Sequence, residues 1–503
     1  MAAVSAGVAV ERTAAVPTHP RALPIAVGAL GLGVLAQLLF FDVGLGINLP
    51  IAILALLLAG WLAGGRPLRG LRPADAWMPV AALVLASFVA IRGDRTLVTL
   101  DVLGSLTLAA ASVAAFGSLR VVERPLGGVL VLAGRVIGSA AVRSAAIMGT
   151  VTRQLPATPG RASLGPWAGV VRGLLIALPL VLLFVALFSA ADAVFAEWTE
   201  RLTDWNLDLG GFIGRTVLAL VVAWVAGGLM GFAACPGEDP TEAELAGAWS
   251  RRRRIGTIEI VTVLVAIGVV FAAFVALQAT YLFGGRDTLA ETGLTYAEYA
   301  RRGFFELLAV AFLVGGLVLA AESFVRERTL PYRVALIGLV VMTLVVLASA
   351  FLRLRLYQDA YGWTELRFYV MAAIFWLAIG AVMAVATILA NRSGWLVHGL
   401  VVLSVVFGLA FNVIGPVRFV AEQNVARAAA DVEIDVEYLL GLGADAAPFA
   451  LQSLGQKNPT GPPDVVNRVT DLVAAFSGLD DPGNNAWQAW NLSREKAREL
   501  LGR

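Results

Sequence analysis

The stretch FLRLRLYQDAYGWTELRFYV, residues 351–370, lies between two of the most apolar runs in the chain. It holds arginines, carboxylates and tyrosines, and it contains Gly362, a residue suited to end a helix. Thr364 and Glu365 then fit the N-cap and the first turn of a second helix, where a negative charge suits the helix dipole. The pattern predicts two membrane-length helices joined by a short polar turn.

The composition extends this prediction to the whole chain. Hydrophobic residues make up 59% of the 503 positions, and only 15% are charged. A soluble domain is nearer half apolar and a quarter charged. The apolar residues also gather into blocks close to the roughly 20 residues that a membrane-spanning helix needs. We therefore expect an integral membrane protein with many spans.

The blocks lack the alternation over ten-residue units that is typical of a membrane barrel, so we predict an all-α, polytopic helical bundle with a small helical C-terminal region. About eleven transmembrane helices are expected, near residues 24–41, 47–64, 77–91, 97–119, 168–190, 211–234, 257–283, 303–321, 330–352, 366–390 and 395–417. The expected organisation is a polar N-terminal tail (1–23), a first group of about four transmembrane helices (24–119), an arginine-containing cytoplasmic or interfacial segment (120–167), a second group of about seven helices (168–417) and the helical C-terminal region (418–503).

Residues 121–150 form the ambiguous segment of this scheme. Arg124, Arg135 and Arg143 interrupt it at wide spacing. We interpret it as a helix lying at the membrane interface.

Arginine is unevenly distributed between the connections. With a cytoplasmic N-terminus, the inward-facing connections carry the larger share of the arginines, as the positive-inside rule requires. Eleven spans then place the C-terminus on the extracytoplasmic side.

One face is expected to be more elaborate than the other. The connections 189–211, 281–303 and 352–365 follow odd-numbered spans and share a face with the C-terminal region. They hold most of the unusual charged and aromatic residues, and we call this side the elaborated face.

The elaborated face holds the candidate ligand-binding residues. These are Arg353, Arg355, Arg367, Arg301, Arg302, Tyr357 and Tyr361, with Asp359, Glu365, Glu298 and Glu306 as supporting carboxylates. One interpretation is a belt at the helix ends, in which arginines snorkel to lipid phosphates and tyrosines lie at headgroup depth. The other is a site for an anionic group, because the planar guanidinium can bind two oxygens at once. We favour the belt, because such belts are general and carboxylates lie within reach.

Several motifs also resemble a known family. TYAEYARRGFFELL, RLRLYQDAYGWTELR, FSAADAVF and AEQNVARAAADVEIDVEYLLGLGADAAPFAL, in this order, resemble the bacterial multi-pass family catalogued as domain of unknown function 4173, related to 4153. The resemblance covers roughly residues 165–455. It implies a bacterial cytoplasmic-membrane protein and brings no activity, cofactor or catalytic residue.

Catalysis has little basis in the sequence. His19 and His398 are the two histidines and Cys235 the sole cysteine, which makes a histidine–cysteine metal site or a structural disulfide improbable. We expect no catalytic residue, no metal and no cofactor. Asn412, inside the last span, is expected either to cap a kink before Pro416 or to bond across helices, with packing the favoured role.

The C-terminal region contains amphipathic pieces too short for a large core, so we expect it to dock on the spans. Trp487 and Trp490 fit either a small core or the membrane interface. The leading functional hypothesis is a non-enzymatic envelope sensor or scaffold that recognises an anionic lipid headgroup or a protein partner. The alternative is a secondary transporter or lipid flippase. Membrane lipids are expected partners and nucleic acid is not, while the sequence leaves the oligomeric state open.

Overall fold

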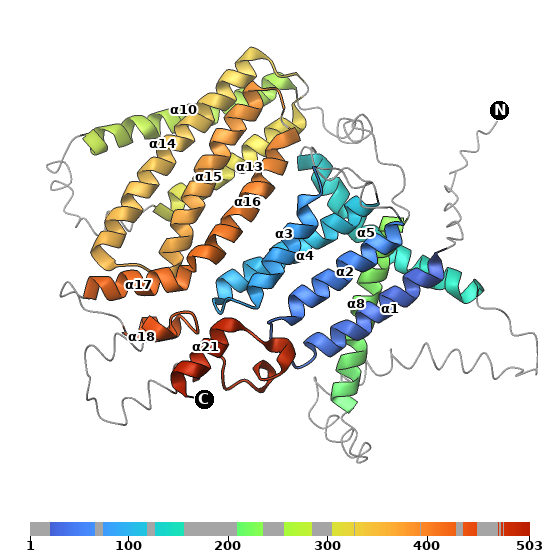
Figure 1. Cartoon of the computed structure of the whole chain (residues 1–503). Coiled ribbons are helices and arrows are strands. Elements are labelled where there is room, and N and C mark those ends of the chain that lie inside the picture. Colours follow the sequence, from blue (N-terminus) through green and yellow to red (C-terminus); the bar gives the residue numbers. More distant parts are fainter. Residues whose placement is uncertain are drawn as a thin grey trace, which may run out of the picture.

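The structure is a computed structural model, and it describes residues 21–65, 74–117, 126–154, 209–234, 256–283, 304–325, 327–392, 394–428, 436–449, 471, 474–475 and 477–502. Every regular element in these ranges is a helix (Figure 1). The longer helices are α1 (Ala22–Phe40), α2 (Asn48–Gly64), α3 (Trp77–Val89), α4 (Arg95–Phe116), α5 (Leu126–Gln154), α8 (Leu209–Ala234), α10 (Thr257–Phe283), α13 (Phe304–Phe324), α14 (Leu330–Tyr361), α15 (Glu365–Leu389), α16 (Gly394–Ile414), α17 (Pro416–Ala428) and α21 (Leu492–Leu501). Helix α18 (Val436–Gly441) and two 3₁₀ turns, Pro482–Asn484 and Trp487–Ala489, complete the C-terminal region.

Nine helices within the described ranges are long and apolar enough to cross a membrane, namely α1, α4, α5, α8, α10, α13, α14, α15 and α16. The apolar helices α2 and α3 are shorter. The all-helical membrane fold is therefore as expected, but the count of about eleven is not established. The predicted span at 168–190 lies outside the described residues.

Helix α5 covers most of residues 121–150, the segment that we interpreted as interfacial. It is a continuous helix of 29 residues, and Leu126–Met148 is long and apolar enough for a span. Arg143 is accommodated because it packs against α8, where its Nη1 donates to Gly231 O at 3.0 Å. Its guanidinium also lies 5.2 Å from the centre of the Phe232 ring. Arg143 thus has partners on a neighbouring helix, and the interfacial position of this segment stays a prediction.

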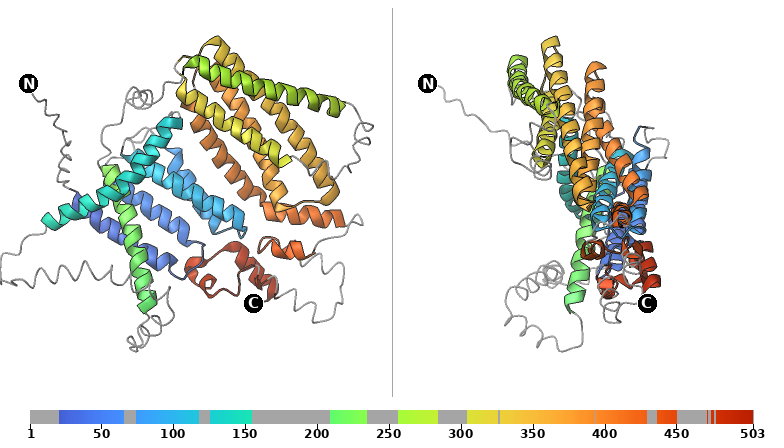
Figure 2. Two further views of the ribbon diagram at one scale, coloured as in Figure 1. Left: turned by 180° about the vertical axis from the view of Figure 1, so that it is seen from behind. Right: turned by 90° about the vertical axis from the view of Figure 1, so that its left-hand side faces the viewer.

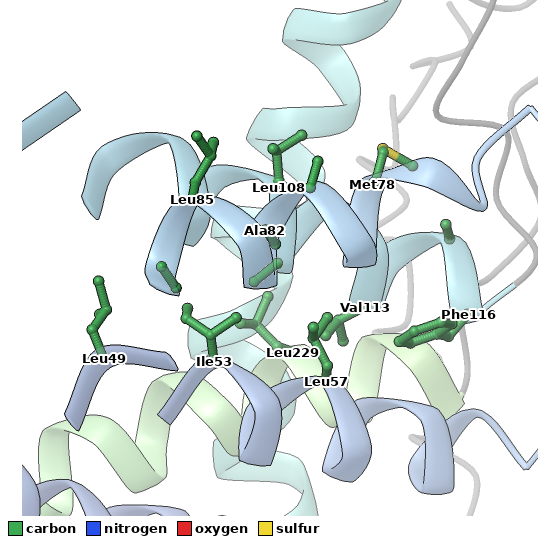
Figure 3. Packing of buried hydrophobic residues seen from close by; sticks show 14 of the residues in the cluster. Leu49, Ile53, Leu57, Met78, Ala82, Leu85, Leu108, Val113, Phe116 and Leu229 are labelled. Atoms are coloured by element: carbon green, nitrogen blue, oxygen red, sulfur yellow. The ribbon is translucent and has the colours of Figure 1, made fainter. Parts of the chain in front are cut away.

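The helices form two halves. In the first, α2, α3, α4 and α8 surround one apolar core, whose packing is shown in Figure 3. In the second, α10, α13, α14, α15 and α16 enclose two further apolar clusters. Helix α16 lies beside α3 and α4, so the halves meet there (Figure 1). Seen edge-on in Figure 2, the described helices form a slab rather than a closed cylinder.

Small residues allow the first half to pack tightly. A Cβ on Gly33 of α1 would lie 2.2 Å from the carbonyl oxygen of Ala219 in α8, and one on Gly60 would lie 2.6 Å from Val113. Contact this close requires glycine, as expected for glycines in membrane helices.

The C-terminal region docks on the helix turns, as predicted (Figure 1). Gly44 in the α1–α2 turn donates its N–H to Gly483 O at 3.0 Å, and Leu492 donates to Ala90 O in the α3–α4 turn at 2.9 Å. Asn424 of α17 exchanges two hydrogen bonds with the backbone of Trp363, in the α14–α15 turn. The predicted shared face of the C-terminal region and the 352–365 connection is thereby confirmed.

The two tryptophans of the C-terminal region do not form a small core. Trp487 is 66% exposed and Trp490 is 42% exposed. The small-core expectation is wrong for both. Their placement at a membrane interface stays a prediction.

Candidate functional site

Arg367 acts as a structural cap rather than an open anion contact. Its Nη1 donates to the carbonyl oxygens of Tyr361 and Gly362, at 3.1 and 2.6 Å. Its guanidinium lies 4.2 Å from the centre of the Tyr357 ring and 6.0 Å from that of Tyr361. The structure therefore brings these three predicted site residues together, but it directs the cation to the end of α14, where the helix dipole favours positive charge.

Arg353 and Arg355 lie in the last three turns of α14. They are two residues apart on α14, a spacing that directs side chains to different sides of a helix. Arg353 is half-buried and Arg355 is exposed. Within the described ranges, no carboxylate lies within ion-pair distance of Arg355, so the expected neutralisation by Asp359 is absent.

The remaining predicted residues are scattered. Glu298, Arg301 and Arg302 lie outside the described residues. Glu306 is exposed in the first turn of α13. Glu365 faces the first half, where its Oε1 accepts a hydrogen bond from the Thr96 hydroxyl at 2.5 Å.

A different group of polar residues meets between the halves, and we call it the polar junction: Arg92, Asp94, Asp101, Glu365, Tyr369, Asn412 and Asp445. Its deepest members are Asp101 of α4 and Asn412 of α16, which are 1% and 0% exposed. Asn412 Nδ2 donates to Asp101 Oδ1 at 2.8 Å and to Oδ2 at 3.0 Å. Because both residues lie inside membrane-length helices, their bond is shielded from water and links the halves directly.

Arg92 forms hydrogen bonds with the end of α16, next to this pair. Its guanidinium donates to the carbonyl oxygens of Asn412 and Val413, the latter at 3.4 Å. These carbonyls belong to the last turn of α16, which lacks partners of its own. Gly415 follows with φ of +67°, and a Cβ there would lie 3.0 Å from Arg92 Nη1. The close approach of the arginine therefore depends on glycine at this position.

Asp94 belongs to the first half and lies nearer the helix ends than Asp101. Its Oδ1 caps α4 by accepting from Thr96 N and Leu97 N, at 2.8 and 3.1 Å. The Tyr369 hydroxyl of α15 donates to its Oδ2 at 3.2 Å. Burial, with Glu365 and Asp445 nearby, raises the pKa of Asp94 to about 6, although the capping bonds favour its ionised form.

Asp445 joins the C-terminal region to the same place. Its Oδ2 accepts from Gly93 N at 2.8 Å and from Asp94 N at 3.0 Å, and its Oδ1 accepts from the Ser493 hydroxyl. Asn491 adds bonds from its Nδ2 to Val89 O and Arg92 O, at 2.9 and 2.8 Å. The C-terminal region thus holds the backbone of the α3–α4 turn.

The junction suits proton exchange better than metal binding. Among the described residues, no group of three histidine, cysteine or acidic side chains is arranged to hold a metal ion. Carboxylates and a phenol can instead bind and release protons, and an amide can offer either a donor or an acceptor to them.

Sequence reasoning missed most of this junction. We predicted residues 97–119 as a transmembrane helix and did not single out Asp101 within it. A carboxylate inside a predicted span was the available signal. Of the two alternatives for Asn412, the structure shows the bond across helices, and its partner is the carboxylate of Asp101.

On the opposite face, Glu322 of α13 is also buried. Its carboxylate pairs with Arg328 at 3.1 Å and accepts from the Tyr332 hydroxyl at 2.8 Å. These bonds fix the short α13–α14 connection, which is a structural role.

The fold and the junction define a polytopic helical membrane protein. The family described as "Domain of unknown function (DUF4153)" matches residues 79–452, and the chain belongs to it. The resemblance had pointed to the related family 4173, over a shorter segment. No curated protein and no solved structure matches the chain.

Proposed function

We propose that this chain is a non-enzymatic sensor or scaffold of the bacterial cytoplasmic membrane, which recognises an anionic headgroup or a protein partner on its elaborated face. One observation carries the proposal: the C-terminal region bonds to turns from both halves. Asn491 binds the α3–α4 turn, and Arg427 donates to the carbonyl oxygens of Gln358 and Asp359 at the end of α14. A ligand that shifts one half against the other would therefore alter how this region docks.

The proposed orientation follows from the arginine distribution. A cytoplasmic N-terminus places the elaborated face, with the C-terminal region, on the extracytoplasmic side. The bacterial location rests on the family resemblance.

Arg353 and Arg355 are the cations that we propose for the anionic ligand. Arg367 is committed to the end of α14, so its contribution is to hold the Tyr357 and Tyr361 rings. An arginine on a helix end at headgroup depth can bind a phosphate or carboxylate.

Native mass spectrometry of the detergent-purified chain tests this proposal. Arg353→Ala with Arg355→Ala should lose a bound anionic lipid or solute that the parent protein retains. Arg392→Ala, which removes an exposed arginine beside the α15–α16 turn, is the matched control. Identical adducts in all three proteins, or none in any, would remove the support for the arginine site.

A secondary transporter or lipid flippase is the second candidate. The specific observation in its favour is the Asp101–Asn412 pair, buried inside two spans at the contact between the halves. Ionisable groups at such depth commonly mark ion or substrate pathways. Vesicles loaded with a pH-sensitive dye would test it: transport predicts a proton flux that Asp101→Asn abolishes, and sensing predicts none.

A further inference from the structure

One atom of the Asn412 side-chain amide has no hydrogen-bond partner. Its Nδ2 bonds to both oxygens of Asp101 and also to Gly408 O at 3.0 Å, whereas its Oδ1 is buried and has no hydrogen-bond partner. An amide oxygen without a partner in an apolar interior is unfavourable. The side chain is 0% exposed and faces Asp101, so this vacant acceptor belongs to the deepest part of the junction.

Protonation of Asp101 would change which atom of the Asn412 amide its carboxyl group can bind. The carboxylate can only accept hydrogen bonds, which matches the observed contacts with Nδ2. The carboxylic acid carries an O–H, which could donate to Oδ1 once the amide turns over. The two protonation states of Asp101 thus correspond to two orientations of one side chain on the facing helix.

Further polar groups lie between this pair and the elaborated face. On α4, Asp94 and Asp101 are seven residues apart, which places them two turns apart on one side of the helix. On α15, Glu365 and Tyr369 are four apart, and Tyr369 bonds to Asp94. The row runs from the helix ends toward the buried pair.

The charged and titratable groups near Asp101 come from several elements. Arg92 lies on the α3–α4 turn, Glu365 and Tyr369 on α15, and Asp445 on the C-terminal region. Helices α2 and α3 contribute no ionisable residue, and that of α8, Arg215, lies over the Phe41 ring. Arg92 is the cation of the group, and its positive charge opposes a divalent metal ion beside Asp101 more strongly than a single proton.

We infer that Asp101 is an intramembrane proton-binding site, loaded from the elaborated face, with Asn412 as the partner that exchanges donor for acceptor when the proton binds. The inference goes beyond the sensor proposal and does not depend on the anionic ligand. It concerns the binding of a proton and holds whether or not the proton crosses the membrane.

Infrared difference spectroscopy of the full chain in lipid vesicles, titrated with pH, tests the inference. The parent protein should show a carboxylic-acid carbonyl band that titrates and that Asp101→Asn removes. Asp42→Asn is the matched control, because Asp42 is exposed in the α1–α2 turn with φ of +53°, a conformation that asparagine tolerates. The control should keep the band.

Asn412→Ala provides a second variant that retains the carboxyl group. It should shift the midpoint of the band by about one pH unit, a tenfold change in proton affinity. An Asp101→Asn protein that folds and keeps every titrating band would overturn the inference, as would an unchanged midpoint in Asn412→Ala. Neither result bears on ligand binding at Arg353 and Arg355, so the two proposals fail separately.

Discussion

Asn412 Nδ2 lies 2.8 Å from Asp101 Oδ1, although the two residues are 311 positions apart in the chain. This bond joins the first half of the molecule to the last membrane-length helix. It occurs where both side chains are buried, so its loss cannot be compensated by water. The pair therefore links the two halves and forms the centre of the polar junction.

The interaction free energy between Asp101 and Asn412 can be measured by a double-mutant cycle. Asn412→Leu should destabilise the protein by about 1–3 kcal/mol, because Asp101 loses its buried donor. The double variant Asp101→Leu with Asn412→Leu should cost less than the sum of the two single changes. In the double variant both partners of the bond are replaced, so neither is left as an unpaired polar group. Thermal unfolding in detergent measures the effects. Thr343→Val is the control, since the Thr343 hydroxyl bonds to Leu339 O of its own helix. Additive effects of the changes at Asp101 and Asn412 would show that the two side chains do not interact.

Asp94 should make stability depend on pH. Its pKa is raised to about 6 from the ordinary 3.8, chiefly by burial. The folded state then holds the proton more tightly than the unfolded chain, so the stability that Asp94 contributes is full below about pH 4 and is lost as the pH rises through about 6. Asp94→Asn keeps an N-cap residue and removes the titration. Thermal unfolding between pH 4 and 7 should show the parent protein losing stability relative to this variant.

The exposed Asp42 provides the control for that titration. Asp42→Asn should give a curve parallel to that of the parent protein. If Asp94→Asn also runs parallel to the parent, the raised pKa is refuted.

Docking of the C-terminal region should depend on Asn491. This residue caps α21, accepting from Arg494 N at 3.1 Å, and also bonds to the α3–α4 turn. Asn491→Ala should cost about 0.5–2 kcal/mol from the lost cap alone and should speed amide hydrogen exchange in residues 484–501. Lys496→Ala changes an exposed residue of the same helix and should leave the exchange unaltered. Equal exchange in both variants would show that the region docks without Asn491.

Packing of α1 on α8 should tolerate no side chain at Gly33. Gly33→Ala places a Cβ 2.2 Å from Ala219 O, so the helices must separate, at a cost of about 1–3 kcal/mol. Gly31 has no atom within 4 Å of its added Cβ, and Gly31→Ala should be neutral or slightly stabilising. A comparison of their melting temperatures in detergent tests the contact, and equal values would exclude it.

Local features of the fold were predictable because their partners are close in the chain. Helix α14 ends at Tyr361 with Gly362 at φ of +79°, and Thr364 caps α15 by accepting from Arg367 N, as the opening stretch predicted. The residues that decide these boundaries lie within one or two turns of them. The contacts of Arg143 in α5 were not predictable in this way, because the carbonyl that receives its guanidinium belongs to α8.

The candidate site was predictable only in part. The sequence located the charged end of α14, but the contacts of Arg367 with Tyr361 and Gly362 emerge only when α15 folds back on α14. Asp94 and Asp445 drew no prediction, because each is an ordinary carboxylate until the C-terminal region meets the α3–α4 turn.

The amino-acid sequence by itself determined that this chain is a helical membrane protein with one elaborated face, because composition and the spacing of apolar blocks decide which segments can enter a bilayer. Tertiary structure alone decided which polar residues share a site. A buried carboxylate such as Asp101 is stable only beside a donor that satisfies it, and that donor is Asn412, near the end of the distant helix α16. Such pairing depends on how helices pack. The spacing of residues along the chain predicts each helix but not which helices become neighbours.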